Sequence, residues 1–463
     1  MPIFEINKDD LLQLTDELLE ELIARLAEAE TVKYGGNTSD VEWSGHIKAP
    51  DDGIDIRMKF SGSNLEGFLK GFLKRKDIIF QSKIEKMSAE KIKNEMTERN
   101  GKLNNAISEL AKNKGGYIIV SLKDDCAPPM KDTRIKAMKK AVSNDTNSDQ
   151  IHLDFFDRSK LLQWLREHVG VKLWVQEKLG KGLSGWKGYG SWSNPPNGTD
   201  DELILAPGVT VTLPDLSQQN LLIKDAIEPI RDLIKNSCKA VRINGLSGVG
   251  KTRIVQALFD QTVGINALDR TIAVYVDTGS KPEPSVQGVL NRLISENISA
   301  IMVIDNCSSE LHSNLAQIFS SSESKISLIT IEYDIRDDKP QNTELINIEA
   351  VGPDIAEILA LRRFPLIGQG NARRIAEFSG GNARLSLAIA ERIEENESLS
   401  QLSDEVLFDR LFEQRKGQDS NLRRDAEVLS LVYSFSINDS DVDNDELNVL
   451  GTIVEQSRFN LFR

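Results

Sequence analysis

Residues 245–252 have the types and spacing that binding to phosphate groups requires. They read Gly-Leu-Ser-Gly-Val-Gly-Lys-Thr. Glycine lets the backbone turn sharply and bring its N–H groups close to phosphate oxygens. A lysine at position 251 can reach the β- and γ-phosphates of a nucleotide, and the hydroxyl of Thr252 can bind Mg²⁺. The chemistry that this stretch favours is therefore the binding of ATP or ADP together with magnesium.

The sequence on both sides of this stretch supports the same interpretation. Residues 239–244 alternate polar with apolar side chains, as a strand does, and residues 252–261 repeat apolar side chains at helical spacing. A strand, a glycine-rich turn and a helix form the context that the P-loop motif requires. The alternative, a chance glycine-rich turn, would not bring both flanks. We predict nucleotide contacts from Gly245, Ser247, Gly248, Val249, Gly250, Lys251, Thr252 and Arg253.

A second carboxylate suited to this site follows further along the chain. Residues 300–304 are apolar and end at Asp305, which is the Walker B pattern, and Asp305 would hold the magnesium shell together with Thr252. The alternative is an ordinary buried strand that ends at a turn. The next residue is Asn306, and an amide cannot accept a proton from water. We therefore expect tight nucleotide binding with slow hydrolysis, as in a switch rather than a motor.

Three polar residues near the N-terminus could form a separate metal site. Gln81 and Lys83 are two apart in an expected strand, so they share one face, and Asp55 lies on the polar face of the preceding strand. A carboxylate and an amide oxygen can share one Mg²⁺, which polarises a phosphate and activates water, while the lysine stabilises charge. A further acid could come from Glu20 or Glu21. The alternative is three solvent-facing polar residues on edge strands.

The elements that would position these groups form an α/β protein of several domains. Residues 9–30 predict one helix, apolar patterns predict strands over 53–60, 77–84, 116–122 and 151–155, and a helix is expected from the second of these strands to about residue 112. After the P-loop, strands are expected at 271–276, 300–304 and 326–331, with helices between them. Strands alternating with helices favour a parallel sheet covered on both faces.

The expected domain boundaries follow shifts in composition. Residues 181–215 are rich in Gly, Ser, Pro and Asn, so we expect a linker there, with Trp186, Tyr189 and Trp192 either pinned to a domain surface or serving as a platform for stacked bases. The predicted organisation is a first α/β domain at 1–180, the linker at 181–215, a nucleotide-binding domain at 216–350, a helical domain at 351–415, and at 416–463 the start of a further small domain that the chain cuts short.

Composition limits the class of protein and its partners. The net charge is −14, so contact with nucleic acid must come from local patches such as residues 70–93 or 131–140, unless these are simply solvated helix faces. No apolar run reaches the ~18 residues that a membrane span needs. Three widely spaced cysteines suggest neither a disulfide framework nor a metal cluster, which predicts a cytoplasmic protein.

The nucleotide-binding part resembles the signal-transduction ATPases with numerous domains, the STAND class. Lys251, Thr252 and Asp305 match that family's functional positions, and residues 379–386 (SGGNARLS) resemble its motif in the helical domain, where Arg384 could face phosphate. The sequence departs from plant-type relatives at Glu332, where they carry an arginine. No histidine follows His312, so the nucleotide-sensing histidine of some relatives is absent.

The N-terminal part resembles the PD-(D/E)xK nucleases of the Mrr-like restriction enzymes, on residues 51–55 (Asp-Asp-Gly-Ile-Asp) and 81–83 (Gln-Ser-Lys). Asp52 replaces a glycine of that motif. Together, these two parts of the sequence resemble the bacterial antiviral STAND proteins, and the resemblance covers most of the chain. They imply a restriction-endonuclease-like fold, cleavage of double-stranded DNA in anti-phage defence, assembly into a homo-oligomer with ATP, a winged-helix-like domain beginning at 416, and a C-terminal sensor for a phage protein that this chain lacks. The alternative is a STAND-type regulatory scaffold with an inactive N-terminal adaptor. A DNA-translocating ATPase is disfavoured by Asn306.

Overall fold

The computed structural model describes most of the chain, and it divides into two compact units. The first unit contains Met1–Asn197, Leu268–Val303 and Ser322–Ser327, and the second contains Gly198–Ala267, Ile304–Ser321 and Leu328–Arg463. No helix within the described residues has the length and apolar character needed to cross a membrane. The residues described are 4–43, 54–98, 100–189, 192, 209–214, 220–321, 324–332, 341–350, 352–391, 422–431, 446–455 and 457.

A five-stranded mixed sheet forms the centre of the N-terminal part. Its order is β1 (Val41–Trp43), β2 (Ile56–Lys59), β3 (Asp77–Lys83), β4 (Gly116–Ser121) and β5 (His152–Asp157). β2 runs antiparallel to β1 and β3, whereas β3, β4 and β5 run parallel. The strands predicted over 53–60, 77–84, 116–122 and 151–155 are confirmed.

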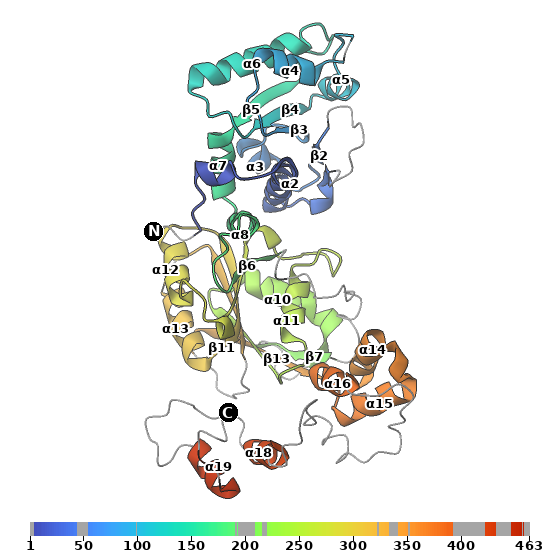
Figure 1. Cartoon of the computed structure of the whole chain (residues 1–463), viewed down its shortest axis with the longest axis vertical. Coiled ribbons are helices and arrows are strands. Elements are labelled where there is room, and N and C mark those ends of the chain that lie inside the picture. Colours follow the sequence, from blue (N-terminus) through green and yellow to red (C-terminus); the bar gives the residue numbers. More distant parts are fainter. Residues whose placement is uncertain are drawn as a thin grey trace. The chain divides into compact units, whose positions relative to one another are not determined.

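Two helical layers cover the two faces of this sheet (Figure 1). Ile78 and Phe80 of β3 point into one apolar core, while Ile79 between them points into the other. The first core is built with α1 (Lys8–Leu11), α2 (Asp16–Lys33), α3 (Leu65–Lys70), α7 (Arg158–Arg166) and α8 (Val169–Lys178). The second is built with α4 (Ala89–Met96), α5 (Asn105–Lys112) and α6 (Pro128–Val142).

Two predicted helices are each broken into two, so those predictions were wrong. The single helix expected over 9–30 is interrupted before Asp16, because the Thr15 side chain accepts a hydrogen bond from Leu18 N (3.2 Å) and starts a new helix there. The helix expected to run to residue 112 is interrupted between α4 and α5 by a turn, in which Gly101 adopts φ 78° and Glu98 N donates to Lys102 O (2.8 Å). Apolar spacing persists through both breaks, so periodicity alone did not show them.

Part of the segment predicted as a linker joins a second sheet. β6 (Trp186–Gly188) pairs antiparallel with β10 (Ala273–Asp277). The Trp186 indole donates to Pro284 O (2.9 Å), and Trp192 stacks on Tyr275 with ring centroids 4.7 Å apart. Both tryptophans are buried, so they pin this segment to a domain surface, which is the first of the two roles the sequence allowed.

The second sheet has eight strands and is parallel only in its middle. β12 (Ile326–Glu332) and β13 (Thr343–Ala350) both run parallel to β9 (Ala240–Asn244). Antiparallel pairs occupy both edges, one between β6 and β10 and the others between β13, β7 and β8. The predicted parallel sheet is thus found in the middle strands, and antiparallel strands extend it. The full order is β6, β10, β11 (Ala300–Cys307), β12, β9, β13, β7 (Val209–Thr212) and β8 (Asn220–Leu222).

Helices fill the rest of the described chain. Those that alternate with the strands are α10 (Ile223–Asn236), α11 (Lys251–Leu258), α12 (Val286–Ser295) and α13 (Ser309–Ser320). A small apolar core joins α14 (Asp354–Arg363), α15 (Gln369–Phe378) and α16 (Ala383–Ala390), as expected for the start of a helical domain. Residues 392–421 lie outside the described residues. So does most of 416–463, where a winged-helix-like domain was predicted, apart from α18 (Leu422–Leu429) and α19 (Glu446–Val454).

Candidate functional site

The glycine-rich turn joins β9 to α11, as the motif predicted. Gly245, Gly248 and Gly250 have φ values of 148°, 87° and 93°, which side chains rarely allow. At Gly245 a Cβ atom would also lie 2.4 Å from the carbonyl oxygen of Ile348, because β13 passes directly beside the turn. These glycines are therefore required by the path of the backbone, which exposes a loop of N–H groups at the start of a helix.

Lys251 is drawn back over its own loop. Its ammonium donates to the carbonyl oxygens of Gly245 (2.5 Å) and Leu246 (3.0 Å), and the side chain is buried. Burial lowers the pKa of Lys251, and the nearby Asp305 carboxylate offsets this in part. A buried cation in contact with carbonyl oxygens and near one carboxylate is suited to an anionic ligand such as a nucleotide phosphate.

Thr252 and Asp305 meet as the two motifs predicted. The Thr252 hydroxyl donates to Asp305 Oδ2 over 2.8 Å, and Asp305 is buried within β11. Oxygen ligands of this kind, a hydroxyl and a carboxylate at hydrogen-bonding distance, fit a magnesium ion that also binds nucleotide phosphates. Asn306 is exposed, adopts φ 52°, and donates its backbone N–H to Asp305 Oδ1 (2.9 Å).

The residues from 382 to 384 lie against the phosphate-binding turn. Asn382 caps α16 by accepting from Leu385 N (3.1 Å), and its Nδ2 donates to the carbonyl oxygen of Ser247 (2.5 Å). A Cβ atom on Gly248 would lie 2.9 Å from Cβ of Arg384, so that side chain starts beside the turn. The sequence singled out Arg384 but not Asn382, although an Asn three residues before the first apolar position of a helix is a capping signal.

The other predicted residues of this site have structural roles in the described chain. Val249 is buried, and Arg253 donates to the side-chain oxygen of Gln256 (2.8 Å) one turn along α11. Glu332, which replaces an arginine of the resembling family, is buried and forms an ion pair with Arg242 of β9. That pair joins the end of β12 to the strand that leads into the phosphate-binding turn.

Asp55 and Gln81 come together at one end of β3. Gln81 Nε2 donates to Asp55 Oδ1 (3.1 Å), while Ser82 donates to Asp55 Oδ2 through its backbone N–H (2.6 Å) and its hydroxyl (2.9 Å). The pairing of Ile56 with Phe80 in the sheet brings the two residues opposite each other. The sequence predicted that Asp55 and Gln81 lie close together, since it placed Asp55 on the polar face of the strand next to the one that carries Gln81.

Lys83 completes the group but pairs with an acid that the sequence did not indicate. Its ammonium lies 2.9 Å from Glu95 Oε1 on α4. The predicted alternatives Glu20 and Glu21 belong to α2, which packs in the layer on the opposite face of the sheet, and Glu21 pairs there with Arg25 (2.8 Å). Glu95 follows Lys83 by twelve residues in a helix, and nothing in its spacing showed which way the helix would turn it.

Burial and like charges shape the electrostatics of this group. Burial raises the pKa of Asp55 above its ordinary value; hydrogen bonds from Ser82 and the charge of Lys83 oppose this, and the charge of Glu95 adds to it. The buried Tyr117 phenol also has a pKa well above its usual range, through burial and then the charges of Glu95 and Asp55. The two carboxylates therefore act on the same small region.

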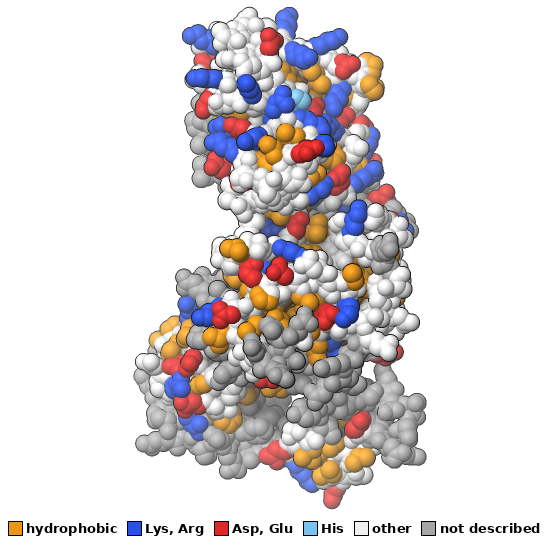
Figure 2. Space-filling view, turned by 180° about the vertical axis from the view of Figure 1, so that it is seen from behind, with side chains coloured by type: hydrophobic (Ala, Val, Ile, Leu, Met, Phe, Trp, Pro, Cys, Tyr) orange, Lys and Arg blue, Asp and Glu red, His pale blue; other side chains and the backbone are white. Residues whose placement is uncertain are grey.

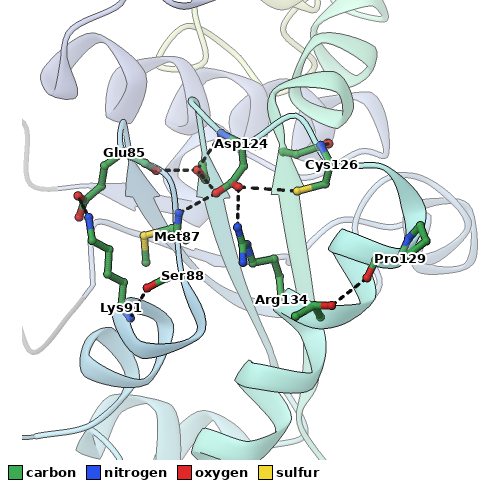
Figure 3. A network of polar contacts seen from close by, with 11 residues as sticks. Glu85, Met87, Ser88, Lys91, Asp124, Cys126, Pro129 and Arg134 are labelled. Carbon is green, nitrogen blue, oxygen red and sulfur yellow. Dashed lines mark hydrogen bonds and ion pairs between the residues drawn. The ribbon is translucent and has the colours of Figure 1, made fainter.

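A polar network fixes the loop that leads into α4 (Figure 3). The buried Asp124 carboxylate accepts from Met87 N (2.8 Å), the Ser121 hydroxyl (2.9 Å) and Arg134 Nη2 of α6 (3.1 Å). The Ser121 hydroxyl also lies 2.8 Å from the carbonyl oxygen of Glu85, so its single hydrogen is shared between these two acceptors. Because this loop precedes α4, the network sets where Glu95 lies.

The residues at Asp55 only partly match a metal site. Among the described residues there is no group of three or more His, Cys, Asp or Glu side chains placed to hold a metal ion. The Asp55 group instead offers carboxylate oxygens together with the buried amide oxygen of Gln81, which has no hydrogen-bond partner in the part of the chain that is described. Mg²⁺ accepts such a mixed oxygen set, since it often binds one or two carboxylates and completes its shell with water and phosphate.

Three lysines of the basic run at 70–93 form ion pairs with acids. Lys70 pairs with Glu66 (2.5 Å), Lys91 pairs with Glu85, and Lys83 pairs with Glu95. Figure 2 shows Lys and Arg side chains spread over the N-terminal part with acidic side chains among them. Any DNA contact in the run at 70–93 would rely on the lysines between these pairs.

Comparison with known proteins gives only distant similarities. No protein-family profile matches the chain, and no curated protein matches it significantly. RuvB of Thermotoga maritima, a Holliday junction branch migration motor, aligns with 14% identity and a TM-score of 0.30, over 51% of this chain and 84% of its own. A STAND protein with a tetratricopeptide repeat sensor from Pyrococcus horikoshii aligns with 14% identity and a TM-score of 0.25. The alignment covers 51% of this chain and 37% of that protein.

NtrX from Brucella abortus, solved in complex with ADP, aligns with 10% identity and a TM-score of 0.28, over 77% of this chain and 84% of its own. Similarities as distant as these assign the chain to no family. The function of the chain is therefore inferred from the geometry of its own residues, around Lys251 in one unit and around Asp55 in the other.

Proposed function

We propose that the chain binds ATP or ADP with Mg²⁺ at the turn between β9 and α11 and uses it as a slow switch. The observation that carries this is the arrangement of Lys251, Thr252 and Asp305: a buried ammonium at the glycine-rich turn, together with a hydroxyl and a carboxylate 2.8 Å apart. Asn306 follows Asp305 and cannot take a proton from water, which supports slow hydrolysis.

We further propose that the N-terminal part is a metal-dependent nuclease for double-stranded DNA. Support comes from Asp55, Gln81 and Lys83, which lie together on one end of β3. A magnesium ion bound there would polarise the scissile phosphate and activate water. Asp55 and Gln81 would hold it, and Lys83 would stabilise charge that develops on the phosphate or take a proton from the attacking water.

The two activities together give an ATP-gated endonuclease effector of anti-phage defence. ATP at the Lys251 site would let chains assemble into a homo-oligomer and bring nuclease parts together on DNA, after a sensor detects a phage protein. This part of the proposal comes from the resemblance to bacterial antiviral STAND proteins, and the resemblance rests on residues 51–83 and 245–252.

Replacing Lys251 by alanine tests the nucleotide half. Loss of the ammonium that faces the phosphates should weaken ATP binding by about 100-fold or more, since charge-assisted contacts to phosphate are worth about 1.5–3 kcal/mol each. Equilibrium binding of a fluorescent ATP analogue measures this. The exposed Lys224 on α10 supplies a matched control, and Lys224→Ala should bind as the unaltered chain does. Equal affinity in Lys251→Ala would exclude this nucleotide site.

A regulatory scaffold is the second candidate. The ion pair between Lys83 and Glu95 (2.9 Å) favours it, because this pair neutralises the lysine that a nuclease would use. The scaffold requires Lys251 but not Lys83. DNA cleavage that is lost in Lys83→Ala would exclude the scaffold. Both candidates predict that Lys83→Ala still assembles with nucleotide.

A further inference from the structure

We propose that Glu95 is a ligand of the metal ion at Asp55 and Gln81, so that the site has two carboxylates from two different elements. This inference rests on the nuclease proposed above and names a residue that it lacked. The structure turns Glu95 of α4 toward the face of β3 that carries Gln81 and Lys83, with Glu95 Oε1 2.9 Å from Lys83 Nζ.

The charges of the group favour a cation. Asp55 and Glu95 carry one negative charge each, and Lys83 supplies a single positive charge, which leaves the group with a net charge of −1. Carboxylates that share a buried region repel each other unless a cation lies between them. A divalent cation would bring the group to +1, which complements one phosphodiester.

One oxygen of the group lacks a hydrogen-bond donor in the described part of the chain, although Asp55 Oδ2 already accepts two hydrogen bonds from Ser82. Within the described residues, Asp55 Oδ1 accepts the hydrogen bond from Gln81 Nε2, and Gln81 Oε1 is buried without a partner. Rotating the Gln81 amide exchanges its nitrogen with its oxygen. Oxygens of Asp55, Gln81 and Glu95 would then face one another, which is the hard oxygen set that Mg²⁺ or Mn²⁺ binds.

A simpler role for Glu95 is to neutralise Lys83. The length of the side chain at position 95 distinguishes this role from that of a metal ligand. Glu95→Asp keeps the negative charge but withdraws the carboxylate by one methylene. A ligand must hold its oxygen within a few tenths of an ångström of the bonding distance, whereas attraction between an ammonium and a carboxylate tolerates a longer separation. Glu95→Gln removes the charge and keeps the length.

The experiment is a titration of the full chain with Mn²⁺, followed by electron paramagnetic resonance of the free ion. No nucleotide is present, so phosphates do not complete the Thr252–Asp305 site. Glu95→Gln, Glu95→Asp and Asp55→Asn should each weaken Mn²⁺ binding by at least about ten-fold, the loss seen even for residues one layer outside a metal. Glu90→Gln, an exposed residue of the same helix, should leave binding unchanged.

Each outcome decides a different point. Unchanged affinity in Glu95→Asp with weaker binding in Glu95→Gln would show that only the charge matters, and would overturn the ligand role. If Glu95→Asp and Glu95→Gln both keep the affinity for Mn²⁺ while Asp55→Asn lowers it, the role of Glu95 is overturned and the nuclease proposal stands. Absence of any Mn²⁺ binding that depends on Asp55 would overturn the metal site itself. Circular dichroism confirms folding, and if Glu95→Gln unfolds, Glu95→Asp decides.

Discussion

At the scale of single residues, Lys251 is held where its own charge is unfavourable. Its pKa is lowered by burial, so the folded chain binds a proton there less readily than the unfolded chain, whose lysines titrate at about 10.4. The free-energy cost is present below the folded pKa and fades as the pH rises from that value through 10.4. A protein keeps such a group when a ligand requires it.

Replacing Lys251 with methionine should therefore stabilise the nucleotide-free protein slightly while removing nucleotide binding. Methionine fills a similar volume without the buried charge, so we expect a gain of about 1 kcal/mol in the free energy of unfolding at pH 7. Urea unfolding at pH 7 and pH 10 measures it, and the gain should shrink at the higher pH. A clear loss of stability at pH 7 would mean that the hydrogen bonds to Gly245 and Leu246 outweigh burial.

The candidate residues that depend on local spacing could be found from the sequence, and those that depend on helix orientation could not. The geometry of a strand places Gln81 and Lys83 on one face, and the phosphate-binding turn has its own pattern. Glu95 and Asn382 depend on how α4 and α16 pack against other elements. The proposed helix acids Glu20 and Glu21 were chosen by charge alone, and α2 lies in the other layer.

At the scale of elements, Asp124 connects three of them around the Asp55 group. It binds the loop before α4, the end of β4, and Arg134 on α6. Both members of the ion pair with Arg134 are largely buried, with side chains 2% and 15% exposed. Removing one member of such a pair leaves the other charge buried alone, which is costly.

Asp124→Asn should destabilise the N-terminal part by about 3 kcal/mol, the lower end of the range for a broken buried pair. Urea unfolding followed by circular dichroism measures this. The neighbouring Asp125 gives a control, because it pairs with Lys8 at the surface (2.8 Å) and its side chain is 34% exposed. Asp125→Asn should cost about 1 kcal/mol or less. Similar losses in the two variants would contradict the role given to Asp124.

Strands were more predictable than helices and sheet edges. Alternation located β2 and β3, whereas short apolar runs located β4 and the buried central strands of the second sheet. Helix ends at Thr15 and Gly101 depend on a cap and a turn inside an apolar repeat, which hid them. The sequence predicted none of β6, β7, β8 and β13. The first three are short, and their place in the sheet depends on pairing with neighbouring strands.

At the scale of the whole molecule, the two chemistries belong to separate units. Asp55 and Lys83 lie in the first, and Lys251 and Asp305 lie in the second. A net charge of −14 and the pairing of Lys70 and Lys91 with acids leave little long-range attraction for DNA. The proposed binding of DNA would therefore rely on local contacts and on several chains acting together, which is why assembly with ATP is central to the proposal.

DNA cleavage by the purified full chain is the decisive measurement for the proposed effector. Linear and circular double-stranded DNA are incubated with Mg²⁺, with and without ATP, beside Lys83→Ala, Lys251→Ala and the exposed control Lys224→Ala. We predict cleavage that needs Mg²⁺ and ATP, is lost by at least about 100-fold in Lys83→Ala and Lys251→Ala, and is kept in Lys224→Ala. Cleavage that persists in Lys83→Ala would contradict the nuclease role. So would DNA that stays intact even when the N-terminal parts are forced to dimerise at high concentration.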